Sequence, residues 1–172
     1  MKENLPKRKR IRLKNYDYNS TGAYFITICA YKRQCLFAKA KQGSSLFFED
    51  DQSSVFTLTE YGIIAKNQLI TLNERYSNVK IGGYAIMPNH IHAIIILEEA
   101  AGASPRPTLS DVICAYKSLT KRECNKIKPI SKLFQNSFYD HVIRNEVDYS
   151  EVLKYIEENP AKWYYDKLYT EQ

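Results

Sequence analysis

The sequence has few of the residues that mark unusual classes of protein. Its 172 residues include 6 glycines, 6 prolines and 4 cysteines with no Cys-x-x-Cys pair, which argues against a low-complexity chain or a disulfide scaffold. No apolar run is longer than that of residues 93–97, whereas a membrane-spanning helix requires about eighteen such residues. The charged amino terminus has no apolar segment behind it. We therefore expect no secretory signal, no membrane partner and a cytoplasmic location without disulfides.

Aromatic and aliphatic residues are abundant. The chain has 14 tyrosines, 7 phenylalanines and 1 tryptophan, and 44% of its residues are hydrophobic. This content is too high for a disordered chain, and the length is that of one domain. The sequence thus predicts a single domain with a substantial core.

Positive charge is concentrated at the amino terminus. The formal net charge is +6, and residues 1–14 hold seven basic residues against one acid, whereas the rest of the chain has equal numbers of each. A basic arm on a neutral body is typical of a segment that lies along nucleic-acid phosphates. The alternative is a solubilising or disordered tail. The candidate contacts are Lys7, Arg8, Lys9, Arg10, Arg12 and Lys14.

Hydrophobic periodicity predicts strands at 23–30, 79–87 and 90–97 and helices at 57–76, from 108 onward and at 147–158. Capping boxes at Thr57-x-x-Glu60 and Thr108-x-x-Asp111 set the first two helix starts, and Pro160 ends the third helix. The predicted order of elements is strand, helix, strand, strand, helix and a further helix. This order favours an α+β fold, with one antiparallel sheet and helices packed on it.

The histidines suggest a site. The chain has three, and His90 and His92 alternate with Ile91 on a strand, so both imidazoles lie on one face and can converge on a divalent metal. A structural role for the pair stays open. Tyr155 and Asn159 are one helical turn apart and can meet the histidine pair. Their ordinary alternatives are a half-buried core tyrosine and a helix-terminal residue.

Further basic residues are candidate DNA contacts. Lys117 and Lys121 belong to a run of six basic residues between 117 and 132 that includes one acid, and such a run also suits a solvated helix face. Arg144 is a candidate phosphate ligand. His141 either contacts DNA, supports the site from a second layer, or is a packed histidine bonded to the backbone.

Several stretches resemble a known family. MPNHIHAIII at 87–96 resembles the His-hydrophobic-His signature of single-tyrosine HUH transposases of the insertion-sequence type. Three other stretches resemble REP-associated tyrosine transposases: NYDYNSTGAYFITICAYKRQCLF at 15–37, TLSDVICAYKSLTKRECN at 108–125 and FYDHVIRNEVDYSEVLKYIEENPAKW at 138–163. The resemblance spans most of residues 10–165 in the same order.

The resemblance implies a ferredoxin-like or RRM-like fold and three segments: a basic arm at 1–14, a catalytic domain at 15–160 and a tail at 161–172. It further implies an endonuclease and strand transferase that cuts single-stranded DNA at hairpin-forming repeats. By position, His90 and His92 would be ligands of Mg²⁺ or Mn²⁺, Tyr155 the nucleophile that forms a 5′-phosphotyrosine, and Asn159 a third ligand. Relatives work as monomers or as homodimers, and the sequence leaves both open.

Two other classes of function remain. The chain would be a DNA-binding module that has lost cleavage, or an RNA-binding or structural protein whose histidines are incidental. The presence of Tyr155, His90 and His92 together argues against the first. RRM-type folds share the predicted topology, which favours the second.

Overall fold

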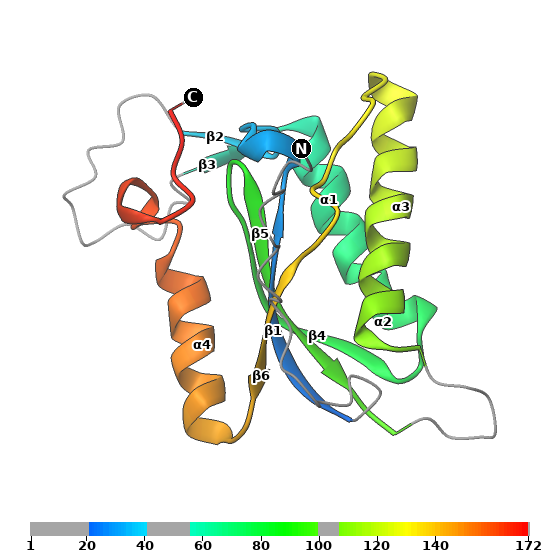
Figure 1. Ribbon diagram of the computed structural model, residues 1–172, viewed down its shortest axis with the longest axis vertical. Helices are drawn as coiled ribbons and strands as arrows, with labels where there is room; N and C mark the ends of the chain where they lie inside the picture. The colour runs from blue at the N-terminus through cyan, green and yellow to red at the C-terminus, as the bar shows by residue number, and fades with distance from the viewer. Residues whose placement is uncertain (1–20, 41–55, 100–106, 172) are drawn as a thin grey trace, which may run out of the picture.

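The computed structural model describes residues 21–40, 56–99 and 107–171. The basic arm and its six candidate DNA contacts lie outside these residues. A single four-stranded sheet separates two layers of helices (Figure 1). In the part of the chain that the structure describes, no helix is long and apolar enough to cross a membrane.

The sheet contains β1 (Gly22–Cys29), β4 (Val79–Ile86), β5 (His90–Leu97) and β6 (Tyr139–Ile143). Its strand order is β4-β5-β1-β6, and each neighbouring pair is antiparallel. The two central strands, β1 and β5, pair so that Thr27 lies opposite His92. This is the strand order of a ferredoxin-like sheet, and the predicted α+β class is confirmed.

Helices cover both faces of the sheet. On one face lie α1 (Glu60–Ile70), the short α2 (Leu72–Arg75) and α3 (Leu109–Ile127), while α4 (Glu146–Glu158) lies on the other (Figure 1). The predicted capping box of α3 is confirmed, because Thr108 and Asp111 each bind the other's backbone N–H. The predicted third helix is α4, whose cap is Asn145.

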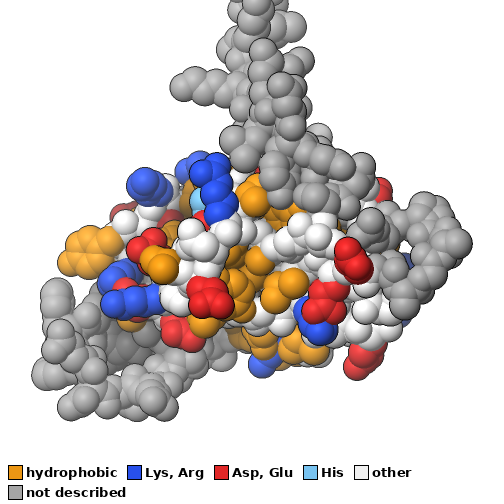
Figure 2. Space-filling view, turned by 90° about the horizontal axis from the view of Figure 1, so that it is seen from below, with side chains coloured by type: hydrophobic (Ala, Val, Ile, Leu, Met, Phe, Trp, Pro, Cys, Tyr) orange, Lys and Arg blue, Asp and Glu red, His pale blue; other side chains and the backbone are white. Residues whose placement is uncertain are grey.

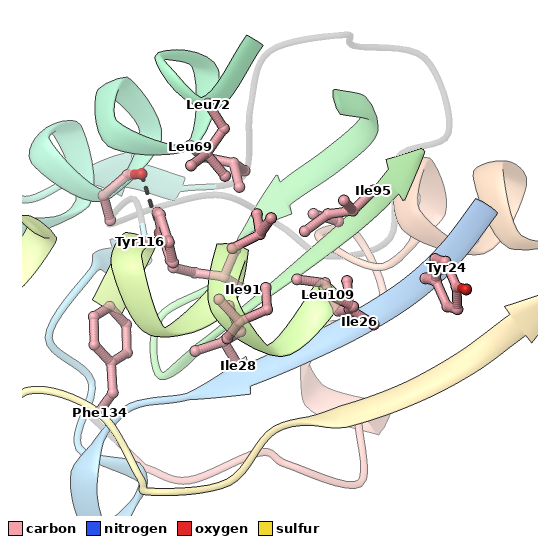
Figure 3. Close-up of a cluster of buried hydrophobic side chains, with 14 of the residues drawn as sticks. Tyr24, Ile26, Ile28, Leu69, Leu72, Ile91, Ile95, Leu109, Tyr116 and Phe134 are labelled. Carbon is pink, nitrogen blue, oxygen red and sulfur yellow. Dashed lines mark hydrogen bonds between the residues drawn. The ribbon is translucent and has the colours of Figure 1, made fainter. Parts of the chain in front are cut away.

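The larger core lies between the sheet and the layer of α1 and α3. Alternate residues of β1, among them Ile26 and Ile28, pack with Ile91 of β5 in this core (Figure 3). The fully buried Tyr116 of α3 donates its hydroxyl hydrogen bond to the Ala65 carbonyl of α1 at 3.1 Å. This bond fixes the two helices against each other at a point that water does not reach.

A smaller core lies beneath α4. Phe25 of β1, Ile94 of β5, Ile156 of α4 and the tail residue Trp163 belong to it. Because the intervening residues of β1 and β5 fill the larger core, both central strands are apolar on both faces. This confirms the prediction of a central strand at 23–30, and it leaves the α4 face as the one on which His90 and His92 stand.

The cap of the first helix lies two residues later than predicted, and the single helix predicted at 57–76 is divided into α1 and α2. Thr57 lies in β3 (Phe56–Leu58), which pairs with β2 (Ala38–Ala40) in a ribbon that the sequence did not predict. The cap is Thr59, whose hydroxyl accepts from Gly62 N at 3.1 Å and donates to the Leu36 carbonyl at 2.6 Å. The hydrogen bonds of Thr59 to the backbone of residues 36–37 therefore determine where the helix begins.

Strand β6 is the other element that the sequence did not predict. It has only five residues, and one of its buried positions is Asp140, so the sequence lacks the apolar period-two pattern of a half-buried strand. It forms because β1 offers an open edge, with which residues 139–143 pair in antiparallel register. Figure 2 shows acidic, basic and hydrophobic side chains interspersed on the face viewed from below.

Candidate metal and nucleophile site

The two strand histidines converge beneath α4. Both side chains are buried, and their Nε2 atoms lie 3.0 Å apart. The Nδ1 of His90 lies 2.8 Å from Asn89 Oδ1, and the Nδ1 of His92 lies 3.0 Å from Thr27 Oγ1. An amide oxygen can only accept, so His90 donates from Nδ1 and turns an Nε2 lone pair toward His92. Second-layer bonds of this kind orient histidine ligands at metal sites.

Both imidazoles are held in the form that binds metal. Burial lowers the pKa of His90 to about 3, with a further contribution from the Arg33 charge. Burial, and then the neighbouring His90, lowers the pKa of His92 to about 3. The pair is therefore neutral at physiological pH, and neutral imidazole is the ligand form.

Asp166 of the carboxy-terminal segment completes a three-residue group with the histidines. One ligand atom from each of the three residues lies within 4.8 Å of the others. The carboxylate is 4% exposed, and its Oδ2 lies 3.7 Å from His90 Nε2. That buried Oδ2 has no hydrogen-bond partner among the described residues, while Leu168 N donates to Oδ1 at 2.6 Å. An unsatisfied buried carboxylate oxygen beside two neutral imidazoles fits a cation. The group can hold a metal ion.

A network around Asn89 places Asp166 over the sheet. The Asn89 side-chain amide donates to the Leu168 carbonyl at 2.7 Å and to Thr170 Oγ1 at 3.0 Å. Trp163 is buried in the core beneath α4. Residues 163–170 thus pack back onto the strand end that carries the histidines. Asp166 was not predicted from the sequence, because nothing in the local pattern distinguishes it from the other acids of the chain.

Tyr155 of α4 faces the histidines. Its ring lies 5.4 Å from the His92 ring and 5.8 Å from the Phe25 ring, both measured between centroids. It is 47% exposed, so a ligand can reach it. Partial burial, and then the Asp166 charge, raises the pKa of its phenol, which the side chain of Asn159 partly offsets. The phenol is therefore protonated at neutral pH.

Asn159 caps α4, one turn after Tyr155. Its side chain is buried, and Nδ2 has no hydrogen-bond partner among the described residues. Its predicted role as a metal ligand stays a prediction.

Three of these side chains line an open pocket of about 630 Å³. His92, Tyr155 and Asp166 line it, together with Phe25, Thr27 and the segment around Gln135–Tyr139. The pocket brings an exposed phenol, one imidazole of the histidine pair and a carboxylate to one surface, while His90 is buried behind His92. It is large enough for several atoms of a polymeric substrate next to the phenol.

The other predicted contacts lie apart from this group. His141 Nε2 bonds the Asp148 carboxylate of α4 at 3.0 Å, and Arg144 is exposed at the start of the same helix. Lys117 and Lys121 are on α3, which covers the opposite face of the sheet. The Lys117 ammonium donates to three carbonyls of residues 135–137, at 2.9, 3.4 and 2.9 Å. It thereby fixes one wall of the pocket.

The chain is similar to a known protein in sequence and to a solved structure in fold. No protein-family model matches it. An uncharacterized protein of Haemophilus influenzae is 30% identical over 180 residues, which cover 95% of this chain and 94% of that protein. The chain belongs to the family of that protein. The solved structure of a REP-associated tyrosine transposase bound to a REP hairpin aligns with 92% of this chain and 74% of its own, at 20% identity and a TM-score of 0.57. The chain shares that fold, as the resemblance implied.

Proposed function

We propose that the protein is a REP-associated tyrosine transposase, a metal-dependent enzyme that cuts single-stranded DNA at hairpin-forming repeats and rejoins the strands. The observation that carries the proposal is the placement of an exposed Tyr155 against His92, in a pocket that Asp166 also lines. His92 and Asp166 form a candidate metal group with the buried His90. The family resemblance of the sequence and the fold shared with a transposase bound to a REP hairpin support it.

His90, His92 and Asp166 would hold the metal, and Asn159 is a candidate fourth ligand. A bound Mg²⁺ or Mn²⁺ would neutralise phosphate oxygens and polarise the scissile bond, which is the main help that a phosphodiester needs. Asp166 adds a negative charge to two neutral imidazoles, and a carboxylate ligand suits both of these cations.

Tyr155 would act as the nucleophile. In the proposed step a bond forms between its phenolic oxygen and phosphorus, and the bond from phosphorus to the 3′-oxygen breaks. The phenol loses its proton, and the departing strand leaves as a free 3′-hydroxyl. The phosphotyrosine ester keeps the phosphodiester energy, so the 3′-hydroxyl of another strand can displace Tyr155 and join DNA without ATP. The reaction is therefore a transesterification, as DNA transposition and recombination require.

DNA contacts would come from basic residues outside this pocket. The amino-terminal arm at 1–14, which lies outside the described residues, would contribute its positive charges, and Arg144 is exposed and can reach a phosphate. Lys121 is half-buried on the opposite layer. Lys117 would act through the wall that its ammonium fixes, because its three donors already face carbonyls. His141 would steady α4 through Asp148.

A covalent adduct assay tests the proposal. Purified wild-type protein and the Tyr155→Phe variant are incubated with labelled hairpin oligonucleotides from the DNA that flanks the gene, with Mn²⁺, with Mg²⁺ and with EDTA. We expect an adduct on denaturing gels that requires both the metal and Tyr155. Tyr149→Phe, on the same helix, is the matched control and should keep the adduct.

Two results would count against the proposal. An adduct that survives Tyr155→Phe would assign the nucleophile elsewhere. Tight hairpin binding without an adduct under any metal would instead identify a hairpin-binding module on the same fold.

A further inference from the structure

A second pocket lies beside the first. It has a volume of about 320 Å³ and is lined by Tyr31, Lys32, Lys132 and residues 135–137. Gln135 and Ser137 line both pockets. The two pockets are therefore adjacent and share part of their lining. We call Tyr31, Lys32 and Lys132 the lysine subsite.

The lysine subsite gathers two positive charges without neutralising them. The Lys132 ammonium lies 4.7 Å from the centre of the Tyr31 ring, and that of Lys32 lies 5.6 Å from it. An aromatic ring holds a cation by its quadrupole and leaves the net charge in place. No acidic side chain lines this pocket, and neither lysine forms an ion pair with any described residue. By contrast, Lys80 is paired with Glu98.

The backbone of the subsite is strained. Lys32 and Arg33 have φ values of 54° and 56°, in the left-handed region that glycine adopts without cost. The Tyr31 N–H donates to the Leu133 carbonyl at 2.8 Å, and the Asn89 side chain donates to the Arg33 carbonyl at 3.3 Å. These bonds hold the turn on both sides. A lysine at such a position points to a function for its side chain, since strained backbone is concentrated at ligand sites.

We infer that the lysine subsite binds a backbone phosphate of single-stranded DNA, next to the phosphate that Tyr155 attacks. The inference rests on the proposed function and extends it to the path of the strand. A single strand carries one phosphate per nucleotide, so a neighbouring phosphate meets the adjacent hollow when one occupies the pocket of Tyr155. Tyr31 is a positioning residue, because it holds the two ammonium groups in place.

The salt dependence of binding tests this assignment. All variants carry Tyr155→Phe so that binding is measured without turnover, and the probe is a flanking hairpin oligonucleotide with its single-stranded extension. Each phosphate contact on single strands contributes about 0.7 to the slope of log affinity against log salt. The relevant quantity is the ratio of the affinity at 50 mM salt to the affinity at 200 mM salt. Loss of one phosphate contact decreases this ratio by about 2.6-fold, and loss of two contacts decreases it by about 7-fold. We expect Lys32→Gln with Lys132→Gln to show such a decrease in slope.

Three controls isolate the subsite. Lys80→Gln removes the same charge at the far end of the sheet and should leave the slope unchanged. A stem-loop without its single-stranded extension should bind the double variant and its parent with the same slope. Lys32→Gly should lower the slope without lowering the melting temperature, because glycine suits φ 54°. That variant separates loss of charge from loss of fold.

Clear outcomes would overturn the inference. An unchanged slope in the double variant refutes it, as does an equal decrease for Lys80→Gln or for the stem-loop alone. Binding of inorganic phosphate that the double variant abolishes, together with an unchanged DNA slope, would assign the pocket to free phosphate. If wild-type protein forms the adduct but the double variant shows no change in salt slope, the proposed function stands and the subsite is refuted. A slope effect without any adduct supports the subsite and removes the catalytic proposal.

Discussion

Replacing Asp166 by asparagine should raise the stability of the metal-free protein while it removes the response to metal. The Asp166 side chain is 4% exposed, and its Oδ2 has no hydrogen-bond partner among the described residues. A buried unsatisfied polar group costs about 1–3 kcal/mol, and more when it is charged. Asparagine keeps the shape, removes the charge and offers a donor to the unprotonated Nε2 of His90.

The expected change in melting temperature follows from the free-energy cost of the buried carboxylate and from the free energy of metal binding. A gain of about 1–2 kcal/mol corresponds to about 2–8 °C in melting temperature for a chain of this length. In wild-type protein, Mn²⁺ at one hundred times its dissociation constant should add about 2.7 kcal/mol. If Asp166→Asn weakens metal binding about a hundredfold, the same Mn²⁺ concentration adds only about 0.4 kcal/mol. The metal-induced shift should therefore almost vanish.

Thermal unfolding with EDTA and with a Mn²⁺ titration measures both effects. Asp140→Asn is the matched control. Asp140 is also buried, and its Oδ1 has no hydrogen-bond partner among the residues that the structure describes. It lies on the opposite face of the sheet from the histidines, because its register partner Ile26 packs in the larger core. The control should share the metal-free gain and keep the full Mn²⁺ shift. A lower metal-free melting temperature together with an unchanged Mn²⁺ shift for Asp166→Asn would refute the reasoning.

Three further predictions concern the fold. Gly62→Ala should destabilise the protein by about 2 kcal/mol or more, because the new Cβ would lie 1.9 Å from a backbone carbonyl oxygen; a rise in urea midpoint, as helix propensity alone predicts, would contradict this. Tyr116→Phe should cost about 0.5–1.5 kcal/mol in urea unfolding through loss of its buried hydrogen bond, and a neutral result would show that the bond adds nothing. The His141 hydrogen bond, and then the Arg144 N–H, lowers the pKa of Asp148 below its ordinary 3.8. Its stabilising effect is present above that value and is lost as the pH falls through the lower folded-state pKa. Asp148→Asn should therefore flatten the decline in melting temperature below pH 3.8, and parallel acid profiles would disprove the linkage.

The sequence alone determined the parts of this protein that depend on local patterns. Alternation in residues 90–97 placed His90 and His92 on one face of a strand, with Ile91 in the core, because side-chain direction in a strand depends only on the period of two. The spacing of Tyr155 and Asn159 put them on neighbouring turns of a helix, because residues four apart in a helix lie one turn apart on the same face. The cap of the helix at 108 was also legible, since both partners lie within four residues.

Only the tertiary structure decided what joins these elements. The helix start moved from Thr57 to Thr59 because the second threonine reaches the Leu36 carbonyl, 23 residues away. Strand β6 formed because β1 had an open edge. Asp166 entered the site because Asn89 binds the Leu168 carbonyl across 79 residues. Contacts between residues so far apart in the sequence depend on how the elements dock. They cannot be predicted from the identity of a single acidic residue near the carboxy terminus.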